Sequence, residues 1–117
     1  MKVYHWSPTK NRERILKEGL LIMMSEIEYE NPVTGKAETW KPAYICTSPD
    51  PWTAYRYVIP MFGEGNVPPL DLFMVDIDEN DDVILRNDRT INIIEVRLCN
   101  SIPADRVHYL ASREQDY

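Results

Sequence analysis

The sequence predicts an α+β fold, because two helix-like segments occur early and strand-like segments dominate the second half. The helix-like segments are short and end at Gly19 and at Pro60, two residue types that commonly terminate helices. The strand-like segments are rich in Val, Ile and Leu and are separated by polar turns. A chain of 117 residues has the length of one ordinary domain, so we expect residues 1–117 to form a single domain.

The elements follow from local patterns of apolar, capping and turn residues. Ser7 or Thr9 is expected to cap the first helix, and Ser48 the second, whose first turn carries Pro49 and Pro51. The polar stretch 25–42 predicts a long loop or a weak hairpin, and 61–69 predicts a loop. In order, we expect the strand 2–6, the helix 11–17, the extended segment 20–22, the strand 43–47, a helix from 49 to 58, and strands at 70–77, 83–85, 91–99 and 107–110.

The charge balance argues against a nonspecific nucleic-acid binder, because the formal net charge is −6 and the sequence pI is about 4.8. A small dipolar ligand or a protein partner fits an acidic chain better. No apolar run is long enough for a membrane span, and the N-terminus lacks a secretory signal, so we expect a cytoplasmic protein. Cys46 and Cys99 are predicted to be buried free thiols, and the spacing of Cys and His predicts no metal site.

Polar residues interrupt several strand-like segments that are otherwise apolar. The three that we single out are His5, Tyr44 and Glu95. In the segment 91–99, the alternation of a strand places Glu95 on one face with Ile91 and Ile93. A carboxylate on such a face is costly unless it is paired or lines a cleft. Arg97 follows on the same face, so an ordinary Glu95–Arg97 surface pair is the structural alternative.

Three segments resemble the ADP-ribosyltransferase fold family and occur in that family's order. The segments are VYHWSPTKNRERILKEGL, AYICTSPDPWTAYRY and INIIEVRLCNSIPADRV, and they cover about half of the chain. The first is similar to a strand that ends in His-Gly-Ser, the second to the Gly-Ile-Tyr-Phe-Ala segment, and the third to the strand that carries the catalytic Glu. The resemblance implies a split antiparallel β-sheet core with two short helices.

The resemblance is to enzymes of the His-Tyr-Glu type, and it implies a role in NAD chemistry for each matching residue. It implies that His5 orients the adenosine-side ribose of NAD, that Tyr44 stacks on the nicotinamide ring, and that Glu95 bonds the nicotinamide ribose and stabilises the transition state. Trp6 stands where the family has glycine. In the family, the backbone N–H and C=O at this position clamp the carboxamide of nicotinamide. Either Tyr55 or Tyr57 is implied as a second stacking residue, and Ser7 completes the predicted NAD-binding set.

These matches imply a small mono-ADP-ribosyltransferase that uses NAD as co-substrate, similar in kind to toxin or phage-encoded transferases. The acidic charge favours a protein acceptor over nucleic acid. Ile93 stands where arginine-modifying relatives carry Gln or Glu, so arginine is disfavoured as the acceptor. Two alternatives stay open: a non-catalytic binding module, which Trp6 favours, and an NAD glycohydrolase. The residues alone also leave structural explanations open, in which His5, Trp6 and Tyr44 only pack in the core and Ser7 only caps a turn.

Overall fold

The computed structural model describes residues 1–22, 27–40, 44–63, 65–88 and 93–114 of the chain. It confirms an α+β architecture with two short α-helices, α1 (Arg12–Glu18) and α2 (Pro51–Val58). Ser25, Pro42, Ala43 and Ile91, which bound expected elements, lie outside the described residues. The strands are β1 (Lys2–Pro8), β2 (Ile27–Glu30), β3 (Ala37–Trp40), β4 (Ile45–Thr47), β5 (Leu70–Asp76), β6 (Val83–Asp88), β7 (Ile93–Leu98) and β8 (Val107–Arg113).

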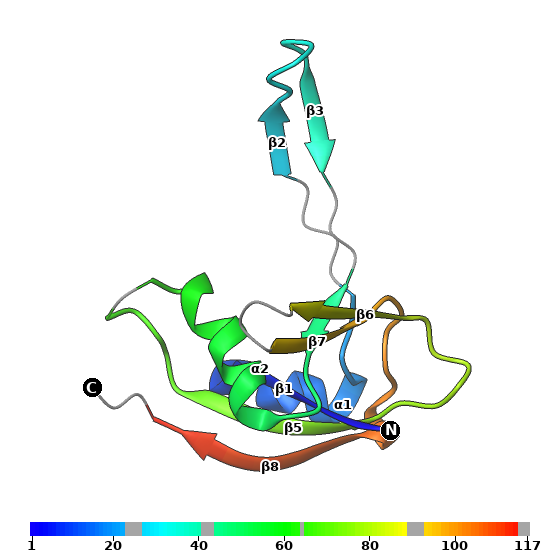
Figure 1. Ribbon diagram of the computed structural model, residues 1–117. Helices are drawn as coiled ribbons and strands as arrows, with labels where there is room; N and C mark the ends of the chain where they lie inside the picture. The colour runs from blue at the N-terminus through cyan, green and yellow to red at the C-terminus, as the bar shows by residue number, and fades with distance from the viewer. Residues whose placement is uncertain (23–26, 41–43, 64, 89–92, 115–117) are drawn as a thin grey trace.

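Two antiparallel sheets of three strands each form the body of the molecule (Figure 1). The first has the order β1-β5-β8, and the second has the order β4-β7-β6. Tyr4 and Ser48 join the two sheets by exchanging backbone hydrogen bonds of 2.8 and 3.2 Å. Because this bridge ties the middle of β1 to the chain just after β4, the strands that carry His5 and Cys46 lie next to each other.

Two apolar clusters lie on either side of β1, as the alternation of a strand requires. Val3 belongs to the larger cluster, which packs residues of both sheets against α1 through Ile15. Trp6 belongs to the smaller cluster, which packs against α2 through Ala54. The fully buried members of the larger cluster are Val3, Ile15, Phe73, Val75, Val96, Leu98 and Ile102.

The first helix ends at a glycine that no other residue can replace without strain. Gly19 has φ = 83°, a value that favours glycine, and its N–H donates to the Ile15 carbonyl. A Cβ at this position would lie 2.1 Å from the Ile102 carbonyl oxygen. The close approach lets Leu20 and Ile102 form a backbone bridge with hydrogen bonds of 2.9 and 2.8 Å. The expected glycine terminus is therefore confirmed.

The predicted helix caps are wrong at both helices. No side chain caps α1, because the Thr9 hydroxyl donates to Asp71 instead. Asp50, and not Ser48, caps α2 by accepting a hydrogen bond of 2.9 Å from the Thr53 N–H. The Ser48 hydroxyl accepts a hydrogen bond of 3.2 Å from the Asp50 N–H, so it lies before the helix and does not cap it. At α1 a long-range contact takes the expected capping residue, and at α2 the cap falls two residues later than expected.

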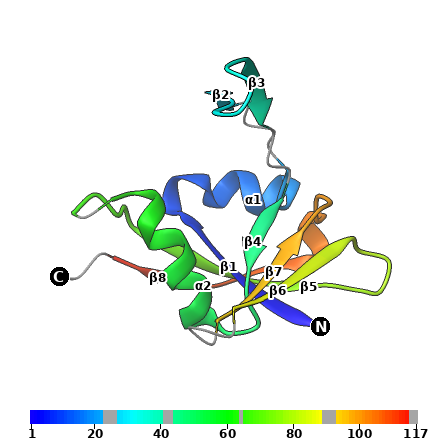
Figure 2. The ribbon, with the colours of Figure 1, turned by 45° about the horizontal axis from the view of Figure 1, so that its top comes forward.

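Strands β2 and β3 form a hairpin that stands away from the two sheets (Figures 1 and 2). Its turn is built by Asn31, whose side chain accepts a hydrogen bond of 2.9 Å from the Val33 N–H, and by Gly35 at φ = 69°. Of the two predictions for this stretch, the hairpin is therefore confirmed for residues 27–40. All of its residues from Pro32 to Glu38 are exposed.

The side chain of Asp71 is fully buried in the middle of the first sheet, and each of its oxygens is hydrogen-bonded. Arg12 donates to both oxygens, at 2.7 and 2.9 Å. The hydroxyls of Thr9 and Ser112 donate to Oδ1 at 2.8 and 2.7 Å. These bonds, led by those from Arg12, hold the pKa of Asp71 below its ordinary value although burial acts in the opposite direction.

Asp71→Asn is expected to destabilise the protein at neutral pH by about 2 to 4 kcal/mol, because buried donors lose a charged acceptor. A carboxyl with a depressed folded pKa contributes stability above its unfolded pKa of about 4, and this stability is lost as the pH falls through the folded pKa. The variant and the parent protein should therefore converge in stability in acid. Urea denaturation between pH 7 and pH 2.5 measures both effects. Glu79→Gln, at an exposed position, should change stability by under about 0.5 kcal/mol. An equally small effect of Asp71→Asn would contradict the structural role assigned to this carboxylate.

Candidate functional site

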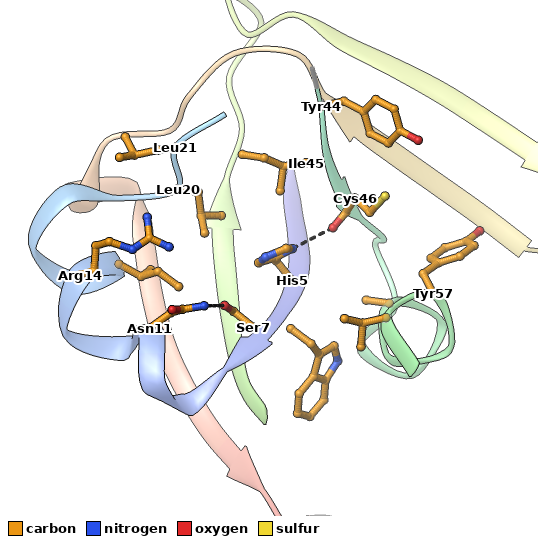
Figure 3. Close-up of a pocket in the computed structure, with 14 residues that line it drawn as sticks. His5, Ser7, Asn11, Arg14, Leu20, Leu21, Tyr44, Ile45, Cys46 and Tyr57 are labelled. Carbon is orange, nitrogen blue, oxygen red and sulfur yellow. Dashed lines mark hydrogen bonds between the residues drawn. The ribbon is translucent and has the colours of Figure 1, made fainter. Parts of the chain in front are cut away.

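A pocket of about 330 Å³ opens where β1, α1, β4 and α2 meet (Figure 3). It contains most of the residues that the sequence predicts as a site, including His5 and the predicted partner Tyr44. None of the described residues of the hairpin 27–40 or of the loop 61–69 is among the lining residues. The lining residues are His5, Trp6, Ser7, Asn11, Arg14, Ile15, Leu20, Leu21, Tyr44, Ile45, Cys46, Ala54, Tyr57 and Val58.

The His5 ring lies in the middle of the pocket lining (Figure 3). Its Nδ1 is 2.8 Å from the backbone carbonyl oxygen of Cys46, which can only accept, so Nδ1 carries the proton. Burial lowers the pKa of His5 below its ordinary value, although this hydrogen bond acts in the opposite direction. The ring is therefore neutral at pH 7, and Nε2 offers a lone pair that can accept a hydrogen bond.

Cys46 connects His5 to Glu95, a role that the sequence pattern did not suggest. Its carbonyl holds the His5 ring, and its Sγ lies 3.9 Å from Glu95 Oε1. Burial, the first cause, and the nearby Glu95 carboxylate raise the pKa of this thiol to about 11. Cys46 and Cys99 are both free, as predicted, but both are partly exposed instead of buried. In the sequence, Cys46 follows two residues after Tyr44 in the same strand-like segment, and this proximity to a predicted site residue was the only indication of its place at the pocket.

Glu95 is buried, with 7% of its surface exposed, although it is not in the pocket lining. Its carboxylate accepts a hydrogen bond from Nε of Arg97. The guanidinium carbon of Arg97 also lies 4.3 Å from the centre of the Tyr44 ring. The Glu95–Arg97 pair that the sequence left as an alternative is therefore formed, but it is half-buried and not a surface pair. Of the apolar neighbours expected on this face, Ile91 lies outside the described residues.

Tyr44 reaches the pocket at its rim, and its ring does not face His5. Figure 3 shows the His5 ring on one side of β4 and the Tyr44 ring and the Cys46 sulfur on the other side. Tyr57 lines the same pocket from α2. Tyr55 does not line it, because its ring packs edge-on against Trp6 at 5.1 Å and lies under the Arg113 guanidinium at 4.7 Å. Of the two tyrosines that the sequence left open, only Tyr57 is at the pocket.

Trp6 uses its side chain for packing, which agrees with the structural alternative for this residue. The indole is 6% exposed, and its Nε1–H donates to the Pro51 carbonyl oxygen at 2.8 Å. The bulky ring therefore anchors the start of α2 and leaves the main chain of Trp6 beside the pocket. Ser7, which the sequence predicts as a binding residue, is buried in the pocket wall and accepts a hydrogen bond of 3.4 Å from the Asn11 amide. Asn11 and Arg14 line the pocket without having been predicted as site residues.

Comparisons of the chain with models of protein families, with curated proteins and with solved structures found no match. No helix within the described residues is both long enough and apolar enough to cross a membrane. Within the same residues, no three His, Cys, Asp or Glu side chains are grouped so that they could hold a metal ion.

The Cys46 thiol is expected to alkylate slowly near neutral pH, because its raised pKa of about 11 leaves little thiolate. In a Cys99→Ser variant, the rate of iodoacetamide labelling should rise about tenfold for each pH unit between 7 and 9, as thiolate accumulates. Mass spectrometry of the labelled protein gives the rate. A rate that levels off below pH 9 would show that the thiol ionises more easily than its burial beside Glu95 implies.

Proposed function

We propose that this protein is a small mono-ADP-ribosyltransferase that cleaves NAD and transfers ADP-ribose to a macromolecule, with a protein acceptor favoured by the acidic charge. The observation that carries the proposal is the shared pocket. His5, Trp6 and Tyr57 line it together with Tyr44 at its rim, and it is large enough for the nicotinamide end of NAD. The two antiparallel sheets joined at Tyr4 and Ser48 support the split-sheet core that the resemblance implies.

The direction of the Trp6 backbone supports a carboxamide clamp at this residue. In an antiparallel strand, the N–H and C=O of one residue point to the same edge, and residues two apart share that edge. Tyr4 directs both groups toward the second sheet, where they bond Ser48. Trp6 therefore directs its N–H and C=O to the same edge, beside the pocket. A backbone donor and acceptor at one edge match the oxygen and the NH₂ of a carboxamide.

The fixed tautomer of His5 supports ribose binding. Because Nδ1 donates to the Cys46 carbonyl, Nε2 is left as an acceptor for a hydroxyl group. The ring must be neutral for this role, since a protonated ring has no lone pair with which to accept a hydrogen bond. The burial that lowers the pKa of His5 keeps the ring in this state at pH 7.

Glu95 supplies the negative charge in this proposal. As the glycosidic bond of NAD breaks, positive charge develops on the nicotinamide ribose, and a fixed carboxylate stabilises that charge. Glu95 lies outside the pocket lining, next to the Cys46 side chain, and Arg97 pairs with its carboxylate. In this proposal Arg97 leaves the carboxylate when NAD binds, so that Glu95 can interact with the nicotinamide ribose.

A non-catalytic binding module is the second candidate, and the Glu95–Arg97 pair favours it. An arginine that neutralises the carboxylate and covers the Tyr44 ring leaves a pocket without an exposed negative charge. Such a protein would bind a ligand beside His5 and would not cleave it. Cleavage of NAD distinguishes the two candidates.

Glu95→Gln is expected to lower single-turnover NAD cleavage by a factor of about 10² to 10³, because it removes the charge and retains the shape. NAD affinity should change much less, since the charge is needed mainly after the bond begins to break. Rapid-quench measurement of nicotinamide release, beside calorimetric binding of NAD, gives both quantities.

Arg97→Gln is the matched control, because it breaks the same ion pair and leaves the carboxylate in place. Arg97→Gln should cost about 1 to 3 kcal/mol of stability, because it leaves the buried Glu95 carboxylate without its charged partner, whereas Glu95→Gln should cost less. Under the transferase proposal, only Glu95→Gln loses most of the cleavage. No cleavage by the parent protein, with NAD still bound, would favour the binding module, and unchanged cleavage in Glu95→Gln would remove Glu95 from the mechanism.

A further inference from the structure

Among the described residues that line the pocket, one side chain carries a full charge at pH 7, and that charge is positive. Within the described residues, no Asp or Glu lines the pocket, and His5 is neutral, so Arg14 is the charged member. The chain as a whole has a net charge of −6. A positive pocket in an acidic protein is unlike the average surface of this molecule, and a concave site concentrates the field of such a charge.

Arg14 differs from the other partly buried arginines in its contacts. Arg12, Arg97 and Arg106 each form an ion pair with a carboxylate, and Arg113 stacks on the rings of Trp52 and Tyr55. Arg14 is partly buried, and the described residues offer it no carboxylate partner. A partly buried guanidinium without a protein partner has its five N–H donors available for a ligand.

Arg14, two polar side chains and the apolar Leu20 and Leu21 lie at one end of the pocket, and aromatic groups lie at the opposite end. Figure 3 shows Arg14, Asn11 and Ser7 on the α1 side, with Tyr44 and Tyr57 across the pocket and His5 between the two groups. The Asn11 amide lies 3.4 Å from the Ser7 hydroxyl, so both side chains are held at the pocket wall. The pocket therefore has a cationic, hydrogen-bonding end and an aromatic end.

We propose that the Arg14 end of the pocket binds the diphosphate of the ligand, with Asn11 and Ser7 as additional hydrogen-bonding groups. This inference rests on the proposed function, in which the ligand is NAD, and it assigns to α1 the recognition of the anionic part. A guanidinium forms bidentate hydrogen bonds with phosphate oxygens, which is the geometry that a diphosphate offers. Nicotinamide compounds without phosphate should therefore bind independently of Arg14.

The test compares the binding of ADP-ribose and of nicotinamide riboside to the full chain by isothermal titration calorimetry. Arg14→Gln should weaken the binding of ADP-ribose about tenfold. This factor is at the low end for a charge-assisted contact, because Arg14 is only partly buried. The same variant should bind nicotinamide riboside as the parent protein does. Lys17→Gln is the matched control, since it removes the same charge from an exposed position of α1 outside the pocket lining, and it should leave both affinities unchanged.

Several outcomes separate this inference from the proposed function. If Arg14→Gln and Lys17→Gln weaken ADP-ribose equally, the effect is one of net charge, and the diphosphate site is overturned. If the parent protein cleaves NAD and Arg14→Gln leaves the KM for NAD unchanged, the inference fails and the transferase proposal stands. If ADP-ribose binding depends on Arg14 and NAD is not cleaved, the diphosphate site holds and the catalytic proposal fails. Equal melting temperatures of both variants establish that the fold is intact.

Discussion

Asp71 lies in the middle strand of the first sheet with its side chain removed from water, and separate parts of the chain donate hydrogen bonds to it. Thr9 donates from the turn after β1, Arg12 from the first residue of α1, and Ser112 from β8. A carboxylate in such a place is tolerated only because its oxygens are fully bonded. The turn from β1 into α1 is fixed by these contacts, and this turn carries the polar end of the pocket.

The pocket depends on β1 because the two faces of this strand have different surroundings. Val3 faces the larger apolar cluster, and Trp6 faces the smaller one. His5, which shares a face with Val3, is turned toward α1 and β4, while the Trp6 ring fixes α2 on the other face. A strand packed on both faces has little freedom to shift, so the pocket walls keep their positions without a bound ligand. This rigidity suits a site in which a fixed charge and fixed hydrogen-bonding groups are to act on a ligand.

The class of fold could be predicted from the sequence because its signals are local and repeated. The alternation that places Val96 and Leu98 on one face of β7 and Glu95 on the other is visible in the chain, and both Val96 and Leu98 are fully buried. The helix caps could not be predicted, since Thr9 is drawn to a buried carboxylate more than 60 residues away in sequence. Capping patterns describe competition among neighbours only.

The candidate site was predicted in part for a similar reason. His5 was predicted because it interrupts an apolar strand, and Ser7 only because the resemblance implied it. Cys46 was missed because its importance comes from its backbone carbonyl, which every residue possesses, and from the position of Glu95 in the neighbouring strand. The partner of Glu95 was visible in the sequence as Arg97, two residues away, but its stacking on Tyr44 depends on how β4 and β7 pair.

The hairpin of β2 and β3 is a segment whose sequence can change with little effect on the rest of the fold. Its exposed residues from Pro32 to Glu38 share no apolar cluster with the two sheets, and its turn is held by its own Asn31 and Gly35. Changes in length at such a position cost little, because the free energy of closing a loop grows only slowly with its length. Packing restricts which substitutions β1 and α1 can tolerate. The hairpin, in contrast, can accept insertions, deletions and substitutions of its exposed side chains. Variation among descendants of this sequence is expected to accumulate there first.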